Sequence, residues 1–155
     1  MSVNKENFGG VVGNAHVFPI RVYYEDTDAG GIVYYANYLK FAERARTELL
    51  RMAEISHSEL MDGDGVAFAV RHCSADFLKP ARLDDALAVH SRVVEVKGAS
   101  IWMEQAVKRD GVDMVRLRVK LACMTKSGRP ARIPASIRTA FDNFFNREMA
   151  SVDGD

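Results

Sequence analysis

The chain has 155 residues and a mass of 17.2 kDa, which favours one domain with a hydrophobic core of its own. Apolar residues make up 48% of the chain and charged residues 27%, a composition that excludes a disordered or fibrous protein. Because 21 Lys and Arg residues balance 21 Asp and Glu residues, the net charge is zero, which argues against a nucleic-acid coat or a polybasic membrane anchor.

The two ends of the chain are expected to lie outside the domain. No stretch approaches the roughly 20 apolar residues that span a bilayer, so no integral membrane segment is predicted. Residues 1–15 lack the apolar core of a signal peptide and are interpreted as a flexible lead-in. A single domain is predicted over 16–148, with a frayed C-terminus at 149–155. Two distant cysteines, Cys73 and Cys123, fit reduced thiols in a cytoplasmic protein.

The first half of the chain predicts a strand followed by a long helix. Residues 16–26 alternate apolar and polar side chains, which is the period of a strand. After a glycine-containing break, apolar residues recur at helical spacing on one face of a helix of about five turns: Tyr38, Phe41, Ala42, Ala45, Leu49 and Met52. A short helical turn is expected over 55–61, before Asp62-Gly-Asp-Gly65.

The second half predicts four more strands and a closing helix. Alternating segments cover 66–78, 86–96, 101–109 and 115–123, and Asp110-Gly111 is a strong hairpin signal. Apolar residues from Ile137 onward indicate a final helix. An antiparallel sheet must bury one face, and the long helix is the available cover. The sequence therefore predicts an α+β fold in which a curled antiparallel sheet of about five strands wraps around one long helix.

Basic residues gather near the end of the chain. Between Met114 and Phe141 there are seven Lys and Arg residues and no Asp or Glu. Such a cluster can bind the phosphates of coenzyme A or of a carrier protein's pantetheine arm. For Arg116, Arg118 and Lys120 we favour a solvated strand face that pairs with acids on neighbouring strands. Arg129 and Arg132, in a loop between two prolines, are the better phosphate candidates.

Most familiar motifs are missing from the sequence. It has no GxGxxG, GxxxxGK[ST] or GxSxG segment, and its four histidines are scattered without the HExxH spacing. We therefore expect neither a metal site nor a cofactor.

The junction between the first strand and the long helix carries the chemistry that stands out. Glu25, Asp26 and Asp28 precede Gly30-Gly31, and one interpretation is ordinary turn chemistry. The other begins from the unpartnered N–H groups at a helix N-terminus, which can stabilise the oxyanion of an acyl transfer. A glycine there lets a carbonyl approach the backbone, and a nearby carboxylate can activate water or attack the carbonyl.

The stretch RVYYEDTDAGGIVYYANYLKFAERARTELLR closely resembles the opening of hotdog-fold acyl-CoA thioesterases of the 4-hydroxybenzoyl-CoA type, and within them the YbgC-like, Tol–Pal-associated branch. FLKPARLDDAL and SGRPARIP fit the same family, so the resemblance covers about residues 16–139. It implies a hotdog fold and hydrolysis of acyl-CoA to free acid and CoA.

The resemblance also implies roles for single residues. Asp28 would be the catalytic carboxylate, as general base or as nucleophile, and the backbone N–H of Tyr35 would contact the thioester oxygen. YbgC-like members usually have His where this chain has Tyr35, whereas the hydroxybenzoyl-CoA branch has Tyr. Gly31, Asn37 and Glu43 are further candidates for substrate contact, although an acid such as Glu43 on a helix is most often solvated or salt-bridged.

Two other functions stay open at this point. One is a non-catalytic hotdog scaffold that binds acyl-CoA or acyl-carrier protein. The other is a hydroxyacyl-thioester dehydratase, whose HFP-type stretch is similar to His16-Val-Phe-Pro19. Hotdog proteins pair so that two sheets become continuous, which implies a homodimer or homotetramer with the site between subunits. A functional link to the Tol–Pal system is also implied.

Overall fold

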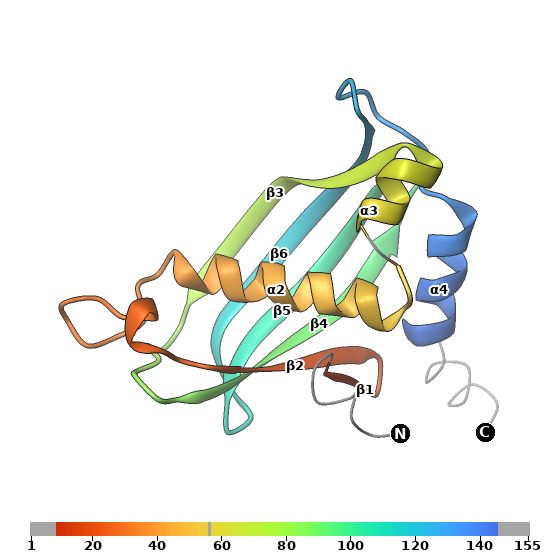
Figure 1. The fold of residues 1–155 in the computed structure, drawn as a ribbon. Coiled ribbons are helices and arrows are strands. Elements are labelled where there is room, and N and C mark those ends of the chain that lie inside the picture. Colours follow the sequence, from red (N-terminus) through yellow and green to blue (C-terminus); the bar gives the residue numbers. More distant parts are fainter. Residues whose placement is uncertain (1–8, 56, 146–155) are drawn as a thin grey trace, which may run out of the picture.

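A computed structural model describes residues 9–55 and 57–145. Within them, six antiparallel strands form one sheet, and the long helix α2 (Asn37–Met52) lies along one face of that sheet (Figure 1). The strands are β1 (Gly10–Val12), β2 (Ala15–Arg21), β3 (Val66–Phe77), β4 (Ala86–Val96), β5 (Ser100–Arg109) and β6 (Val112–Thr125). Their order across the sheet is β1-β2-β4-β5-β6-β3, so β3 forms one edge. The predicted α+β architecture is confirmed, with one strand more than expected.

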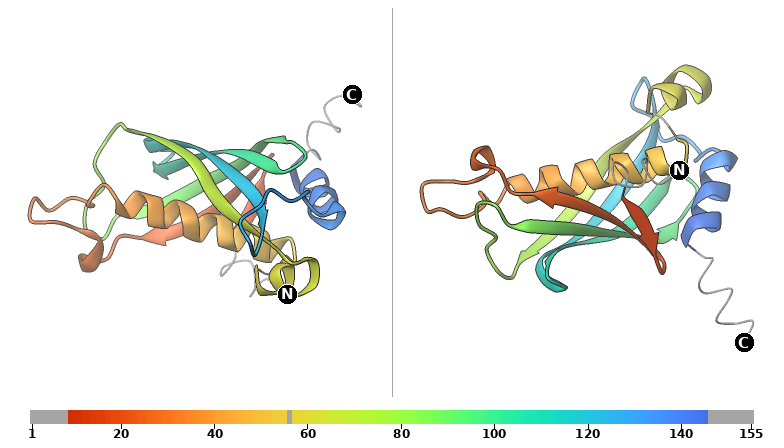
Figure 2. Two further views of the ribbon diagram at one scale, coloured as in Figure 1. Left: turned by 90° about the horizontal axis from the view of Figure 1, so that it is seen from above. Right: turned by 60° about the horizontal axis from the view of Figure 1, so that its bottom comes forward.

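Shorter helices connect and close the sheet. A single 3-10 turn, η1 (Tyr24–Asp26), follows β2, and α3 (His57–Glu59) continues into the π-helical turn η2 (Leu60–Asp64) before β3. The last helix, α4 (Ala135–Phe145), stands at the end of the sheet away from the start of α2 (Figure 2). The short helix before β3 and the closing helix confirm the sequence interpretation.

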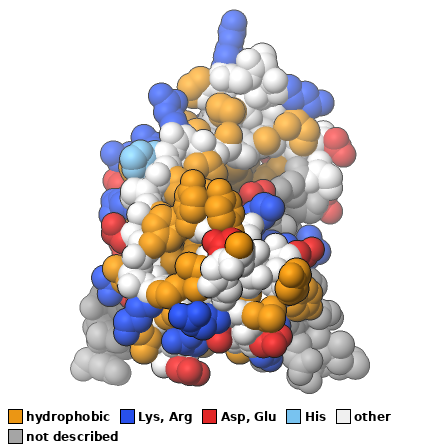
Figure 3. Space-filling model, turned by 90° about the vertical axis from the view of Figure 1, so that its left-hand side faces the viewer, with side chains coloured by type: hydrophobic (Ala, Val, Ile, Leu, Met, Phe, Trp, Pro, Cys, Tyr) orange, Lys and Arg blue, Asp and Glu red, His pale blue; other side chains and the backbone are white. Residues whose placement is uncertain are grey.

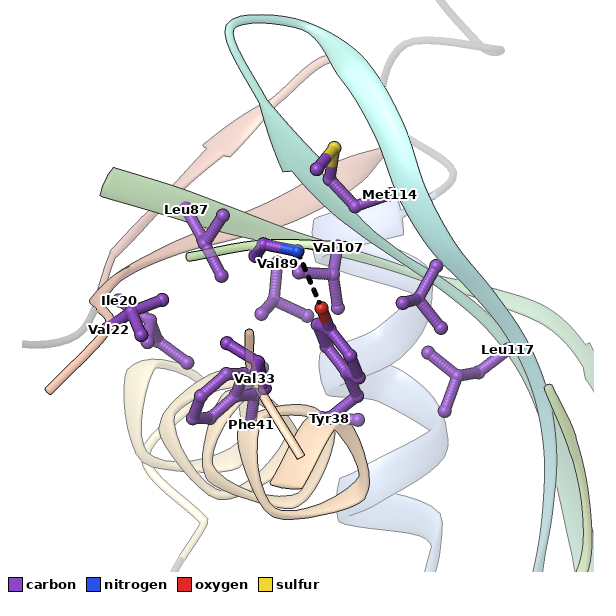
Figure 4. Close-up of a cluster of buried hydrophobic side chains, with 14 of the residues drawn as sticks. Ile20, Val22, Val33, Tyr38, Phe41, Leu87, Val89, Val107, Met114 and Leu117 are labelled. Carbon is purple, nitrogen blue, oxygen red and sulfur yellow. Dashed lines mark hydrogen bonds between the residues drawn. The ribbon is translucent and has the colours of Figure 1, made fainter. Parts of the chain in front are cut away.

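The core lies between α2 and the sheet. The apolar face of α2 buries five of the six residues that set its helical spacing in the sequence, Tyr38, Phe41, Ala42, Ala45 and Leu49, while the sixth, Met52, is half-buried. The first four pack against Val89, Val107, Val115 and other side chains from the central strands (Figure 4). Leu49 belongs to a second buried cluster, which includes Ile101 and Met103 of β5. Of the predicted apolar face of β6, Val115, Leu117, Val119 and Cys123 are buried and Leu121 is half-buried. Burial of this apolar area is the main force that holds α2 on the sheet.

The N-terminal part of the fold corrects two expectations. Residues 10–12 form β1 and pair with β2 in the register Gly10↔Val17, so this part of the predicted lead-in belongs to the sheet. The first predicted strand ends at Arg21 rather than at Asp26, because the Asp26 side chain accepts the N–H of Tyr23 and closes the turn η1. Residues 1–8 and 149–155 lie outside the described residues.

The face of β6 that points away from α2 carries the predicted basic row. Arg118 pairs with Glu104 on the neighbouring strand β5 at 4.0 Å, as expected, whereas Arg116 pairs with Asp113 of its own strand at 2.7 Å. Lys120 instead lies over the Trp102 ring, with its ammonium 5.6 Å from the ring centroid. These contacts are those of a solvated sheet face.

No helix in the described part of the chain is both long enough and apolar enough to cross a bilayer. The two cysteines are both free thiols; Cys123 is buried, and Cys73 is exposed on the edge strand β3.

Candidate active site

The junction between β2 and α2 is organised by a buried carboxylate. Asp26 is 9% exposed, and its Oδ2 accepts a hydrogen bond of 2.8 Å from the backbone N–H of Tyr23. The backbone carbonyl of Asp26 accepts two more bonds, from the N–H of Tyr34 at 3.0 Å and from the side-chain amide of Asn37 at 2.8 Å. Asp26 therefore holds the end of β2 against the start of the helix.

The loop between these two elements presents Asp28. An antiparallel bridge between Thr27 and Val33 closes the loop, which projects from the end of the sheet (Figure 1). At its tip, the Asp28 carbonyl accepts the N–H of Gly31 at 3.0 Å, and Asp28 Oδ1 accepts the N–H of Gly30 at 2.8 Å. The Asp28 side chain is exposed and oriented by its own turn.

Each of the two glycines in this loop is favoured for a different reason, one by its backbone conformation and the other by the space beside it. Gly31 has φ +79°, in the left-handed region that favours glycine. A Cβ at position 30 would lie 3.2 Å from Asp28 Oδ1, so a side chain there would crowd the carboxylate. The double glycine thus sets the conformation in which Asp28 is presented, and Gly31 acts through the backbone.

The start of α2 leaves backbone donors unused. The N-cap residue, Ala36, has no side chain that can accept the first N–H groups of the helix. Within residues 9–55 and 57–145, no acceptor is found for the backbone N–H of Tyr35 or of Ala36. These donors lie at the positive end of the helix dipole, where a carbonyl oxygen that gains negative charge is stabilised.

Aromatic side chains cluster at the start of α2. Tyr35 is 58% exposed, and its ring centroid lies 5.0 Å from that of Tyr34. Its ring also meets the ring of Phe77, at the end of β3, edge-on with the centroids 5.8 Å apart. Beneath them Tyr38 is buried, and its hydroxyl accepts the N–H of Ala81 at 3.0 Å (Figure 4). Burial raises the pKa of Tyr38 above its usual range. Figure 3, which views this end of the molecule, shows apolar side chains gathered at its centre.

The structure brings together only part of the predicted site. Asp28, Gly31, Tyr35 and Asn37 share one end of the sheet, but the Asn37 amide already binds the Asp26 carbonyl. Glu43 is exposed further along α2. Arg129 and Arg132 follow β6 at the opposite end of the sheet (Figure 1).

Two residues of this region were missed from the sequence. In the sequence, Asp26 is not distinguished from Glu25 and Asp28 as an acid of the turn. The only signal for its burial is its position at the end of a segment of alternating apolar residues. Phe77 reads as an ordinary strand residue, because its contact with Tyr35 joins segments far apart in the chain.

The structure bears on two further expectations. In the described residues, no three His, Cys, Asp or Glu side chains come together in a way that could hold a metal ion. His16, part of the dehydratase-like stretch, is fully buried in β2 opposite Ser91 of β4 and not at the helix start.

Comparisons with known proteins agree with this architecture. Residues 22–141 match the model of the thioesterase-like superfamily. The acyl-CoA thioesterase YbgC of Haemophilus influenzae is 44% identical over 129 residues, which cover 83% of this chain and 95% of that protein. The acyl-CoA thioester hydrolase YbgC of Escherichia coli O6:H1 is 40% identical over 126 residues, 80% of this chain and 93% of that one.

Solved structures give the same result. A probable thioesterase from Bartonella henselae superposes with a TM-score of 0.75 at 37% identity, over 77% of this chain and 99% of that chain. Family model, sequence relatives and fold all coincide over the segment that contains the Asp28 loop, α2 and the sheet. This chain therefore belongs to the thioesterase-like superfamily of hotdog proteins.

Proposed function

We propose that this protein is an acyl-CoA thioesterase that hydrolyses the thioester of acyl-CoA to a free acid and CoA. The acyl carbonyl oxygen binds the N–H groups of Tyr35 and Ala36 at the start of α2. The Asp28 carboxylate takes a proton from water as the water oxygen attacks the carbonyl carbon. The carbon–sulfur bond then breaks, and the thiolate leaves with the electron pair and recovers that proton. A variant of this route, in which Asp28 itself attacks and forms an anhydride, uses the same residues.

One observation carries this proposal: two backbone donors without described acceptors begin the long helix, one short loop after an oriented, exposed carboxylate. A thioester suits this arrangement because its leaving thiolate needs little protonation, so one carboxylate and an oxyanion site suffice. The names of the YbgC relatives support the same reaction class.

The proposal includes assembly of at least a homodimer, as either a dimer or a homotetramer. The edge strand β3 has one neighbour in the sheet, and the apolar side chains of Val70 and Phe77 on it are each 50% exposed. A long exposed edge of this kind is normally covered. Pairing with a second copy covers the edge and places a second subunit beside Tyr35. Light scattering at micromolar concentration tests the assembly, and a fully active stable monomer would contradict it.

The test of the reaction is thiol release from short-chain, long-chain and aromatic acyl-CoAs by the parent protein and by Asp28→Asn. Asparagine keeps an oxygen that can accept the Gly30 N–H, so the loop is preserved while the base is lost. We expect turnover to fall by roughly 10²-fold or more. Asp62→Asn, an exposed acid on η2, is the matched control with parental turnover. Parental turnover by Asp28→Asn would refute the mechanism.

The same assay separates the alternatives. Binding of acyl-CoA without thiol release by the parent protein would favour a scaffold, and an enoyl product would favour a dehydratase. Whether CoA or a carrier protein delivers the acyl group is decided by comparing the two thioesters. The functional link to the Tol–Pal system stays a prediction.

A further inference from the structure

The face of the sheet that points away from α2 has an open hollow of about 320 Å³. Ala106 of β5 lies beneath it, between His90 of β4 and Arg116 of β6, which are its register partners on either side. Because the alanine side chain is short and both neighbours are long, the surface sinks at this point. The volume is near the lower end of the range for ligand pockets, which suits a small molecule better than a macromolecule.

Two groups of ion-paired side chains flank the hollow, and in each group two cations share one acid. The first group is Arg92, Glu104 and Arg118, with nitrogen–oxygen distances of 3.2 Å and 4.0 Å. The second group is Lys108, Asp113 and Arg116, with distances of 3.3 Å and 2.7 Å. All of these residues except Arg118 line the hollow. Since one negative charge faces two positive charges, each group keeps one positive charge that its own acid does not balance.

The two groups stand on opposite sides of Ala106. Glu104 precedes it and Lys108 follows it on β5, and the span between these two residues is about 14 Å along the strand. Asp76 of β3 is the register partner of Arg116, but among the described residues no ion pair joins the two. The hollow is therefore bordered by a surplus positive charge on each of two sides.

The rest of the rim is polar and uncharged at neutral pH. His90 is half-buried, and its burial together with the nearby Lys108 lowers its pKa, which Asp113 only partly offsets. The imidazole is thus neutral at pH 7 and has one N–H to donate. Asn14, just before β2, adds a side-chain amide. The hollow therefore offers hydrogen-bond donors between the two surplus charges.

We propose that this hollow binds a small organic dianion, whose two anionic groups reach the two ion-pair groups and whose carbon skeleton lies over Ala106. Guanidinium groups bind carboxylate and phosphate through paired, charge-assisted hydrogen bonds, which suits Arg92 and Arg116. Their side chains are 42% and 63% exposed, and exposed ion pairs add little to stability, so both can turn to a ligand at small cost. Because the hollow and α2 lie on opposite faces of the sheet, this inference does not depend on the proposed acyl-thioester reaction.

Isothermal titration calorimetry tests the site with the dicarboxylates succinate, glutarate and adipate, each compared with the monocarboxylate of the same chain length. We expect the dicarboxylate that fits best to bind at least about tenfold more tightly than its monocarboxylate, because only the dianion reaches both groups. Arg92→Ala and Arg116→Ala should each weaken its binding on the order of tenfold, whereas Arg44→Ala, at an exposed position of α2, keeps the parental affinity. If no dicarboxylate binds more tightly than its monocarboxylate, the proposal is wrong.

A further variant tests the place of the ligand without changing any charge. Ala106→Leu fills the hollow, so we expect it to abolish dicarboxylate binding, while urea unfolding shows that the chain still folds. Unchanged binding by Ala106→Leu would place the ligand elsewhere and overturn the proposal. Arg92→Ala and Arg116→Ala should keep the parental KM for acyl-CoA, and a raised KM would assign these cations to the substrate instead of to a separate site.

Two more measurements identify what occupies the hollow. Phosphoglycolate, in which a phosphate replaces one carboxylate, separates the two kinds of dianion: tighter binding than succinate points to a phosphorylated acid, and weaker binding points to a dicarboxylate. Light scattering tests for a second copy of the chain on this face. An assembly that becomes smaller in Arg92→Ala/Arg116→Ala, together with no dicarboxylate binding by the parent, would show such a copy and refute the dianion site.

Discussion

The side-chain amide of Asn37 donates a hydrogen bond of 2.8 Å to the backbone carbonyl of Asp26, eleven residues earlier in the chain. This bond ties the first residue of α2 to the end of η1 and so brackets the loop that carries Asp28. The same carbonyl also accepts the N–H of Tyr34. Asn37 is therefore suited to position the helix start relative to the carboxylate, and one N–H of its amide is committed to that contact.

We expect Asn37→Ala to lower kcat more than it raises KM, because the substitution loosens the loop without removing a ligand contact. The loss in unfolding free energy should be about 1 kcal/mol, the net value of one such bond. Thiol-release kinetics and urea unfolding measure the two effects, with Lys40→Ala, exposed on the same helix, as control. A rise in KM at constant kcat would instead show that Asn37 binds substrate directly.

Tyr38→Phe tests the support beneath the aromatic cluster. The phenolic oxygen accepts the N–H of Ala81, and its removal leaves that buried donor unsatisfied, which costs about 1–3 kcal/mol. Urea unfolding at pH 7 measures the loss, and Tyr24→Phe, at a residue 82% exposed, should change stability little. Equal stability of Tyr38→Phe and the parent would show that this hydrogen bond contributes nothing.

The raised pKa of Tyr38 also predicts that the unfolding free energy falls at alkaline pH. Burial raises the pKa of Tyr38, so the folded state holds this proton more tightly than the unfolded chain. The contribution of Tyr38 is thus fully present below the unfolded pKa of about 10 and is lost as pH rises through the folded pKa. Unfolding free energies measured between pH 8 and pH 11 should fall more steeply for the parent than for Tyr38→Phe.

The sequence predicted those parts of the fold whose signals are local. The apolar spacing from Tyr38 to Met52 set the inner face of α2, and the alternation from Val115 to Cys123 set the faces of β6. The three-residue strand β1 was missed because so short a segment has no readable period. It exists through its pairing with β2, a contact that the local pattern does not encode.

In the candidate site, too, the sequence predicted the residues with local signals and not those whose placement depends on distant contacts. Asp28 and Tyr35 were predictable because a strand end, two glycines and a helix start follow one another in the chain. The separation of Arg129 and Arg132 from Asp28 was not, because it depends on the length and edge position of β3. The burial of Asp26 depends on backbone donors that no spacing reveals. The cytoplasmic location and the Tol–Pal link stay predictions.

Asp85 predicts an acid-sensitive contact at the start of β4. Its Oδ2 accepts the Arg82 N–H at 2.8 Å and a guanidinium N–H of Arg109 at 2.9 Å. Burial alone would raise the pKa of Asp85, but these donors and the nearby positive charges outweigh it and hold the pKa below its usual range. Its contribution is therefore present above the unfolded pKa of about 3.9 and lost as pH falls through the folded pKa.

We expect Asp85→Asn to be less stable than the parent at pH 7 and the difference to shrink below about pH 4. Urea unfolding at pH 7, 5, 4 and 3 gives the two curves. Asp110 is an exposed hairpin acid without an ion pair among the described residues, so the unfolding free energy of Asp110→Asn should change with pH as that of the parent does. A difference between Asp85→Asn and the parent that is constant with pH would show that the carboxylate charge is not responsible.

Substitution of Gln105 should lower the unfolding free energy through several buried partners at once, Arg46 among them. Its Nε2 donates to the Ala42 carbonyl at 3.0 Å and to Ser91 Oγ at 2.9 Å, and its Oε1 accepts Arg46 Nη1 at 2.9 Å. Burial lowers the pKa of Arg46, so its guanidinium depends on this acceptor. Gln105→Leu should therefore cost about 2–3 kcal/mol, because it leaves a desolvated charge and a buried hydroxyl without their partner.

The double-mutant cycle identifies which orphaned group dominates that cost. If it is the guanidinium, adding Arg46→Leu to Gln105→Leu removes the uncompensated charge, and the double variant is less destabilised than the sum of the two single variants. A coupling energy above about 0.5 kcal/mol in urea unfolding would meet this expectation. Additive losses would instead assign the cost to Ser91 and to the Ala42 carbonyl, since those partners are lost whether or not Arg46 is present.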